Sequence, residues 1–239
     1  MNKKFEFTGE TKAILGNTLH RIRALISFGK VGAGELGGWI EKEENLDASG
    51  NAWVCDDAQV SGNAQVCDDA QVSGNAQVSG NACVYGDAQV CDDAQVSGNA
   101  RVYGDAWVFV NARVDGDAWV YGDAWVYGDA WVSGNARVSG NACVYGDARV
   151  SGNARVYKRG AIFWISNVGS RDDTATFFAC RDKKIKVIVG CFFGDLDGFA
   201  AAVQKTHGDN THAKVYRLAI EMAKERIKMD DMLEESNDG

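Results

Sequence analysis

One six-residue phrase, Ala-x-Val-x-Gly-Asn/Asp, constrains the fold of this chain more than any other feature. It occurs eighteen times in succession without an insertion, from Ala52 to Val156. The Ala and Val positions never vary, whereas the residue between them changes among Gln, Trp, Arg and Cys. In an extended segment alternate side chains point to opposite faces, so Ala and Val are predicted to share an inner face and the variable residues an outer one.

The last two positions of each unit are predicted to form a corner. They are Gly-Asn or Gly-Asp in thirteen of the eighteen units, and these residue types tolerate the left-handed backbone region and bend a chain easily. Each unit is therefore a very short strand followed by a turn. Because one unit cannot bury its own apolar face, the units are expected to coil and stack around a continuous core of Val and Ala. The predicted fold class is mainly β.

The repeat resembles the hexapeptide repeat of left-handed parallel β-helices, in which three units close one triangular coil. That resemblance implies the left-handed sense and the triangular section, which the period alone does not fix. Six coils would then form a prism of roughly 29 Å, at about 4.8 Å per stacked strand. Residues 48–157 are assigned to this β-helix, residues 1–47 to a small β N-terminal cap and residues 158–239 to an α+β C-terminal domain.

The outward residues of such coils fall into vertical ranks on three walls. One wall contains no Arg and carries an aromatic patch in the last three coils, above Trp53 of the first coil. Contiguous exposed apolar surface marks an interaction site, although stacked aromatic residues also stabilise neighbouring strands without any ligand. The predicted binding residues are Trp107, Phe109, Trp125, Tyr127 and Tyr145.

The other two walls place a tryptophan between two arginines. The expected cation–π ladders, which need no ligand, are Arg101-Trp119-Arg137 and Arg113-Trp131-Arg149.

The segments that flank the repeat are predicted to close its two ends. In the N-terminal segment, Gly16 and Asn17 form a hairpin-type turn between two extended stretches. After the repeat, residues 161–166, 174–180 and 184–190 are predicted strands. Two helices should follow, with Asp195 and Asn210 as their N-caps.

Charge argues against nucleic acid as a direct partner. The chain has a net charge of −8, and residues 50–157 alone contain thirteen Asp and five Arg with no Glu or Lys, which is also −8. Phosphate binding needs clustered Lys and Arg. The regular acidic column Asp69, Asp87, Asp105 and Asp123 leaves open an acidic mimic of a polyanion.

Apolar patterning and cysteine usage indicate a cytoplasmic protein. No apolar run reaches the length of a membrane span, and polar residues follow the basic start where a signal peptide would be apolar. The seven cysteines include no vertical neighbours in the predicted coils. They are therefore expected to stay reduced.

Catalytic and ligand-binding signals are weak. Many left-handed β-helices are acyltransferases that use a histidine as base, but the repeat contains no histidine, and His20, His207 and His212 lie in the flanks. Gly32 to Gly37 has the spacing of a dinucleotide-binding fingerprint, but leads into the repeat rather than into a helix. The acidic column alone does not supply the six to eight oxygens that calcium needs. We therefore expect no enzyme activity, cofactor or metal.

Phrases in both flanks sharpen the resemblance. They include 19–25 (LHRIRAL), 37–46 (GGWIEKEENL), 190–194 (GCFFG) and 207–210 (HGDN). Together with the repeat, they resemble hexapeptide-repeat proteins of bacteria, phages and prophages, sometimes labelled polymer-forming, whose shared chemistry is unknown. The predicted function is structural or protein-binding, through a protein partner or through self-association, for example as a homotrimer. The alternative is a phage counter-defence factor that sequesters a host component.

Overall fold

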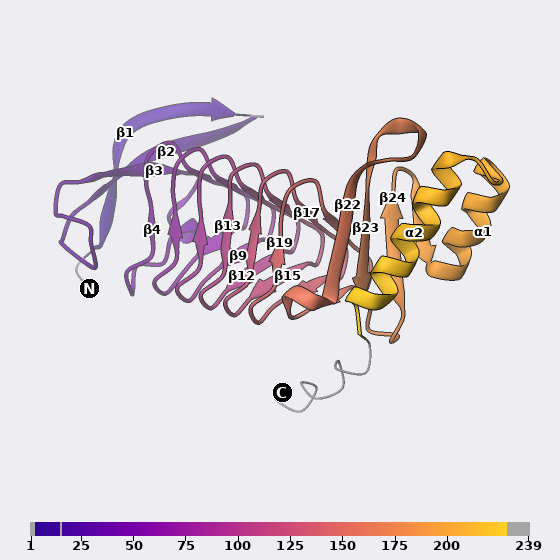
Figure 1. Ribbon diagram of the computed structural model, residues 1–239. Coiled ribbons are helices and arrows are strands. Elements are labelled where there is room, and N and C mark those ends of the chain that lie inside the picture. The colour runs from indigo at the N-terminus through magenta and orange to yellow at the C-terminus, as the bar shows by residue number, and fades with distance from the viewer. Residues whose placement is uncertain (1–2, 15, 229–239) are drawn as a thin grey trace.

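The computed structural model describes residues 3–14 and 16–228, and residues 1–2, 15 and 229–239 lie outside the described part. It is a long prism of stacked coils with a twisted strand ribbon at its N-terminal end (Figure 1). A small sheet with two helices closes the C-terminal end. The predicted mainly-β solenoid is confirmed, whereas its handedness stays a prediction.

The prism consists of eighteen strands of two or three residues each, arranged in parallel on three walls. The first wall contains β4 (Trp53–Val54), β7 (Gln71–Val72), β10 (Gln89–Val90), β13 (Trp107–Phe109), β16 (Trp125–Tyr127) and β19 (Cys143–Val144). The second contains β5 (Gln59–Val60), β8 (Gln77–Val78), β11 (Gln95–Val96), β14 (Arg113–Val114), β17 (Trp131–Val132) and β20 (Arg149–Val150). The third contains β6 (Gln65–Val66), β9 (Cys83–Val84), β12 (Arg101–Tyr103), β15 (Trp119–Tyr121), β18 (Arg137–Val138) and β21 (Arg155–Val156).

Strands of successive coils pair residues that are eighteen apart in the sequence. Trp107 pairs with Trp125 and Val108 with Val126, and the same offset holds along each wall of the repeat. Backbone N–H groups donate to carbonyls of the next coil, as in Ser79 to Val96 at 2.9 Å. The invariant Val and Ala of every unit are fully buried, so the predicted inner face is confirmed.

Corner residues link the coils through their side chains. The Asn81 amide donates to Asn99 Oδ1, and the Asn99 amide to Asp117 Oδ1, each at 2.9 Å. In three units Asp replaces the corner glycine and adopts a positive φ, and its carboxylate accepts from a backbone N–H one coil further on. Asp92 Oδ2, for example, accepts from the Val110 N–H at 3.2 Å. These ladders satisfy polar groups that repeat at every coil.

The N-terminal ribbon continues the second wall. Strands β1 (Phe5–Ile14) and β2 (Asn17–Ala24) form an antiparallel pair, and β2 pairs with β3 (Leu36–Ile40). Strand β3 then runs parallel to β5, with Trp39 opposite Gln59. After a short 3-10 turn, η1 (Glu43–Asn45), Leu46 bridges to Val66. The parallel stack therefore begins within residues 1–47, and adds most of one turn to the six predicted coils.

Trp53 lies in its predicted rank, opposite Gln71, but it is buried rather than exposed. Its side chain is only 1% exposed, because the N-terminal segment covers it. Phe28 packs edge-on against its ring at 5.4 Å. A Cβ on Gly37 would come within 2.7 Å of the ring, so the glycine lets β3 approach closely. The glycine-rich stretch thus opens a strand that packs on the first coil, not a nucleotide-binding helix.

A buried lysine satisfies carbonyl groups at this end of the stack. Lys4 is 2% exposed and donates to the carbonyls of Ala52 at 2.8 Å, Asp47 at 3.2 Å and Ser49 at 3.3 Å. Burial lowers the pKa of Lys4, and the neighbouring Asp47 and Asp69 carboxylates oppose that shift. The ammonium group therefore donates to carbonyl groups at the edge of the first coil, which a further strand of the stack would otherwise satisfy.

The C-terminal domain is an antiparallel sheet with two helices. The strands are β22 (Ile162–Val168), β23 (Asp173–Ala179), β24 (Ile185–Val189) and β25 (Phe192–Asp195), with short turns η2 (Arg159–Ala161) and η3 (Gly169–Arg171). The helices are α1 (Leu196–His207) and α2 (Thr211–Arg226). Three strands match the predicted positions closely, whereas β25 was not predicted. Both predicted N-caps are confirmed: Asp195 accepts from the Gly198 N–H at 2.9 Å and Asn210 from the Ala213 N–H at 3.0 Å.

This domain packs directly on the last coil. The buried Thr176 hydroxyl accepts from the Arg149 N–H at 3.0 Å. The Arg181 N–H donates to the Asn153 carbonyl at 3.1 Å. The sheet therefore covers the open end of the Val and Ala core and satisfies backbone groups of the final strands. Within the described residues, no helix is both long and apolar enough to cross a bilayer.

Candidate functional site

The five predicted binding residues lie together on the first wall, in two parallel columns. Trp107 stacks on Trp125 with ring centroids 5.5 Å apart and planes 10° apart. Beside them, Phe109 stacks on Tyr127 at 4.9 Å and Tyr127 on Tyr145 at 5.0 Å. The two columns touch edge-on where Phe109 meets Trp125, at 6.1 Å. Together these five side chains form the aromatic wall, and the predicted vertical ranks are confirmed.

Exposure is concentrated at two positions of the aromatic wall. Trp125 is 43% exposed and Tyr145 41% exposed, while Trp107, Phe109 and Tyr127 are half-buried between their neighbours. Burial, followed by the nearby Tyr145 hydroxyl, raises the pKa of Tyr127. The Tyr127 hydroxyl therefore stays protonated at physiological pH, and the wall offers flat apolar rings with hydroxyl groups.

The aromatic wall continues into the C-terminal domain, which sequence reasoning did not foresee. Trp164 of β22 packs edge-on against Tyr145 at 4.4 Å. Around this contact lies a groove of about 500 Å³, lined by Tyr127, Cys143, Tyr145, Arg159, Ile162, Phe163, Trp164 and Arg226. We call it the junction groove. Its residues come from the prism, η2, β22 and the end of α2, so their proximity depends on docking that no local motif encodes.

On the other two walls, tryptophan side chains contact charged side chains of the same chain. Arg101 and Arg137 lie over the Trp119 ring at 5.0 and 4.6 Å, which confirms the first predicted cation–π ladder. The second predicted ladder, Arg113-Trp131-Arg149, does not form among the described residues. Trp131 donates from Nε1 to Asp115 Oδ2 at 2.8 Å, and within the described chain neither Arg113 nor Arg149 lies over its ring. The carboxylate competes successfully because it gives a charge-assisted hydrogen bond.

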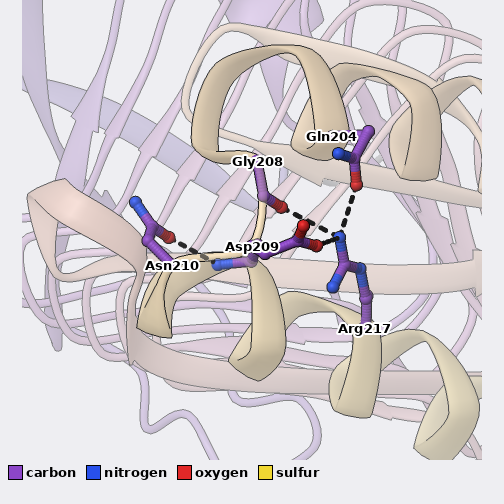
Figure 2. Close-up of polar contacts among 6 residues, drawn as sticks. Gln204, Gly208, Asp209, Asn210 and Arg217 are labelled. Atoms are coloured by element: carbon purple, nitrogen blue, oxygen red, sulfur yellow. Dashed lines mark hydrogen bonds and ion pairs between the residues drawn. The ribbon is translucent and has the colours of Figure 1, made fainter.

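The polar residues between the two C-terminal helices have structural partners. Arg217 Nη2 donates to the Gln204 side chain and, at 2.9 Å each, to the Gly208 carbonyl and Asp209 Oδ1 (Figure 2). Asp209 therefore faces Arg217, whereas the His207 ring lies near His212 and Tyr216, at 5.7 and 5.8 Å. This arrangement fastens the α1–α2 turn and does not present Asp209 and His207 as an acid–base pair.

A second, smaller cavity lies between the C-terminal sheet and α1. It has a volume of about 210 Å³, and Asp173, Cys191 and His207 line it together with apolar residues such as Phe199. Among the described residues, no hydrogen bond joins Cys191 to His207.

Cysteines and carboxylates in the described part give no sign of metal chemistry. All seven cysteines are free. Burial is the main cause that raises the pKa of Cys55 and of Cys180 to about 12, which keeps both thiols protonated. Within the described ranges, no three His, Cys, Asp or Glu side chains are grouped so that they could hold a metal ion.

Fold and wall together define a β-solenoid repeat protein with an exposed aromatic surface. Residues 76–92, 94–108 and 130–146 match the family described as the YdcK β-solenoid repeat. All three segments lie in the stacked coils, so the similarity concerns the repeat and not the flanking domains. A search of curated proteins finds no match to the chain.

Proposed function

We propose that this chain is a rigid, non-enzymatic scaffold that binds a protein partner, or further copies of itself, through the aromatic wall. The observation that carries the proposal is the exposure of Trp125 and Tyr145 in stacked columns, with no cation or carboxylate of the described residues over their rings. Trp119 and Trp131 on the other walls have such partners within the chain. Aromatic residues are enriched at the centres of protein interfaces, where they bury large areas at a small entropic loss.

Rigidity supports the same proposal. Each coil is fixed by backbone hydrogen bonds to its neighbours, and the aromatic rings are held by stacking. A surface that is ordered before binding loses little conformational entropy when a partner docks. A partner should therefore bind a flat, preformed aromatic surface that runs parallel to the prism axis. Assembly into a homotrimer or a larger polymer through the aromatic wall is one form of the proposal.

Two matched variants test this proposal. Trp125→Arg places a cation in the aromatic wall, whereas Trp131→Arg places one at a similarly exposed position, 40% against 43%, on another wall. We expect sedimentation velocity to show concentration-dependent association, or lysate binding to show a retained protein. Either should be lost in Trp125→Arg and kept in Trp131→Arg. The proposal is wrong if the wild-type chain sediments as a monomer and retains no protein in a manner that depends on Trp125.

A further inference from the structure

The junction groove differs from the rest of the molecule in its charge. Arg159 and Arg226 are its charged lining residues, and both are exposed. No carboxylate lines it within the described residues. The adjoining prism, in contrast, carries a net charge of −8 over residues 50–157. The groove is therefore a local positive site on an acidic protein.

The walls of the groove are apolar and aromatic. Tyr145 and Trp164 meet edge-on at 4.4 Å, and Ile162 and Phe163 complete the lining beside them. A segment that fits this groove must combine carboxylates, for the two arginines, with aliphatic side chains, for the rings. Methionine suits such a surface, because its thioether makes favourable contacts with aromatic rings.

The last eleven residues of the sequence have this composition. Residues 229–239, which lie outside the described part, read MDDMLEESNDG and contain five carboxylates and no Lys or Arg. Their apolar residues are Met229, Met232 and Leu233. They follow Arg226, which lines the groove, and Ile227, which is buried at 2% exposure and fixes where the segment leaves the domain.

We propose that residues 229–239 bind in the junction groove of their own chain. The carboxylates of the segment pair with Arg159 and Arg226, and its methionine and leucine side chains contact Tyr145 and Trp164. Attachment beside the groove makes the binding intramolecular, with an effective concentration in the millimolar range. Repulsion from the acidic prism disfavours other positions for five carboxylates. This inference does not depend on the proposed protein-binding role of the aromatic wall, and it leaves Trp125 as the exposed ring for a partner.

The test uses the chain truncated after Lys228 and a fluorescently labelled peptide of residues 229–239. Fluorescence anisotropy in low-salt buffer should show saturable binding of the peptide to the truncated chain. The full-length chain should bind the same peptide at least about tenfold more weakly, because its own segment occupies the groove. Equal binding by both chains would overturn the proposal, as would the absence of binding to the truncated chain.

Charge reversal tests the assigned site. In the truncated chain, Arg159→Glu with Arg226→Glu should weaken binding about tenfold, since attraction at two exposed pairs becomes repulsion. The control is Arg113→Glu with Arg149→Glu, which reverses two exposed arginines on the second wall and should leave binding unchanged. A peptide with lysines in place of its acidic residues should bind the Arg159→Glu, Arg226→Glu chain. Circular dichroism spectra that match the parent chain confirm that the variants fold.

Two further outcomes decide the occupant. A peptide with Ser at positions 229, 232 and 233 should bind about fivefold more weakly, because it lacks the aliphatic contacts. Equal binding of that peptide would overturn the assignment of these side chains to the rings. A single-stranded oligonucleotide that binds the truncated chain more tightly than the peptide, and needs Arg159 and Arg226, would assign the groove to nucleic acid and overturn the proposal.

Discussion

Replacing Gly98 by alanine should destabilise the prism much more than the same change at Gly146. Both glycines occupy corners with a positive φ, +69° and +63° respectively. A Cβ on Gly98 would lie 2.8 Å from the Gly116 nitrogen and 2.9 Å from its oxygen in the next coil. At Gly146 the nearest atom is Trp164 Nε1, at 3.7 Å. The two variants therefore share the backbone strain but differ in the clash between coils.

The expected magnitudes follow from these two effects. A left-handed alanine is disfavoured by about 1–2 kcal/mol, and the reduced freedom of the unfolded chain returns about 0.4–1 kcal/mol. The shared destabilisation is thus about 0–1.6 kcal/mol. Clash with the stacked backbone adds an overpacking penalty of about 1–3 kcal/mol at Gly98 alone. At about 2–4 °C per kcal/mol for a chain of this length, Gly98→Ala should lower the Tm by several degrees more than Gly146→Ala.

Thermal unfolding followed by far-ultraviolet circular dichroism and by tryptophan fluorescence measures the difference. The two signals should coincide if the stack unfolds cooperatively, which allows free energies to be compared. A decrease in Tm that is equal for the two variants within about 1 °C, corresponding to about 0.5 kcal/mol or less, would refute the argument. It would mean that the spacing between coils relaxes to accept a Cβ at no measurable cost.

Three other changes test separate parts of the fold. Val110 has a φ of +63°, which strains a β-branched residue, so Val110→Gly should raise the free energy of unfolding in urea by about 0.5–1 kcal/mol; a decrease would contradict this. Thr176→Val leaves the Arg149 N–H without its acceptor and should lower the free energy of unfolding by about 1–3 kcal/mol, whereas an unchanged value would show that the N–H finds another partner. Folding holds the pKa of Cys55 and Cys180 near 12, against 9.0 for the unperturbed thiol. Because only the unfolded chain loses these protons above about pH 9, stability should fall from pH 9 to 11, and a Cys55→Ala, Cys180→Ala variant with the same slope would exclude these thiols as the cause.

The stacking of the coils could be predicted because the repeat has an invariant period. Eighteen units without an insertion place Val above Val in any coil of whole units, and the resemblance to three-unit coils selects the eighteen-residue register that the structure has. That register also determines the ranks of outward residues, and so Trp107 and Trp125 were placed correctly one above the other. A period of this kind carries information over the whole prism, because each coil repeats the geometry of the last.

Where the sequence prediction was wrong, a contact came from outside the repeat or from a competing side chain. Trp53 occupies an outward rank but is covered by Phe28, which lies far from it in sequence. Trp131 has arginines in the coils on either side and still bonds to Asp115, because the carboxylate lies within hydrogen-bond distance of its Nε1. Neither outcome follows from the period. The junction groove was missed for a similar reason, since it forms only when β22 and α2 dock on the last coils.

The distribution of outward residues indicates where function is concentrated. The invariant Val and Ala of each unit are buried in early and late coils alike, so the core has the same composition along the whole prism. The early coils nevertheless carry mainly Gln outward, whereas all the tryptophans of the repeat beyond Trp53 lie between residues 107 and 131. Stability of the coils therefore does not require the aromatic residues to cluster there. Two of the three walls pair their tryptophans with Arg or Asp from the same chain. In the described chain, the exposed rings of Trp125 and Tyr145 instead contact other aromatic rings, and a partner could cover them.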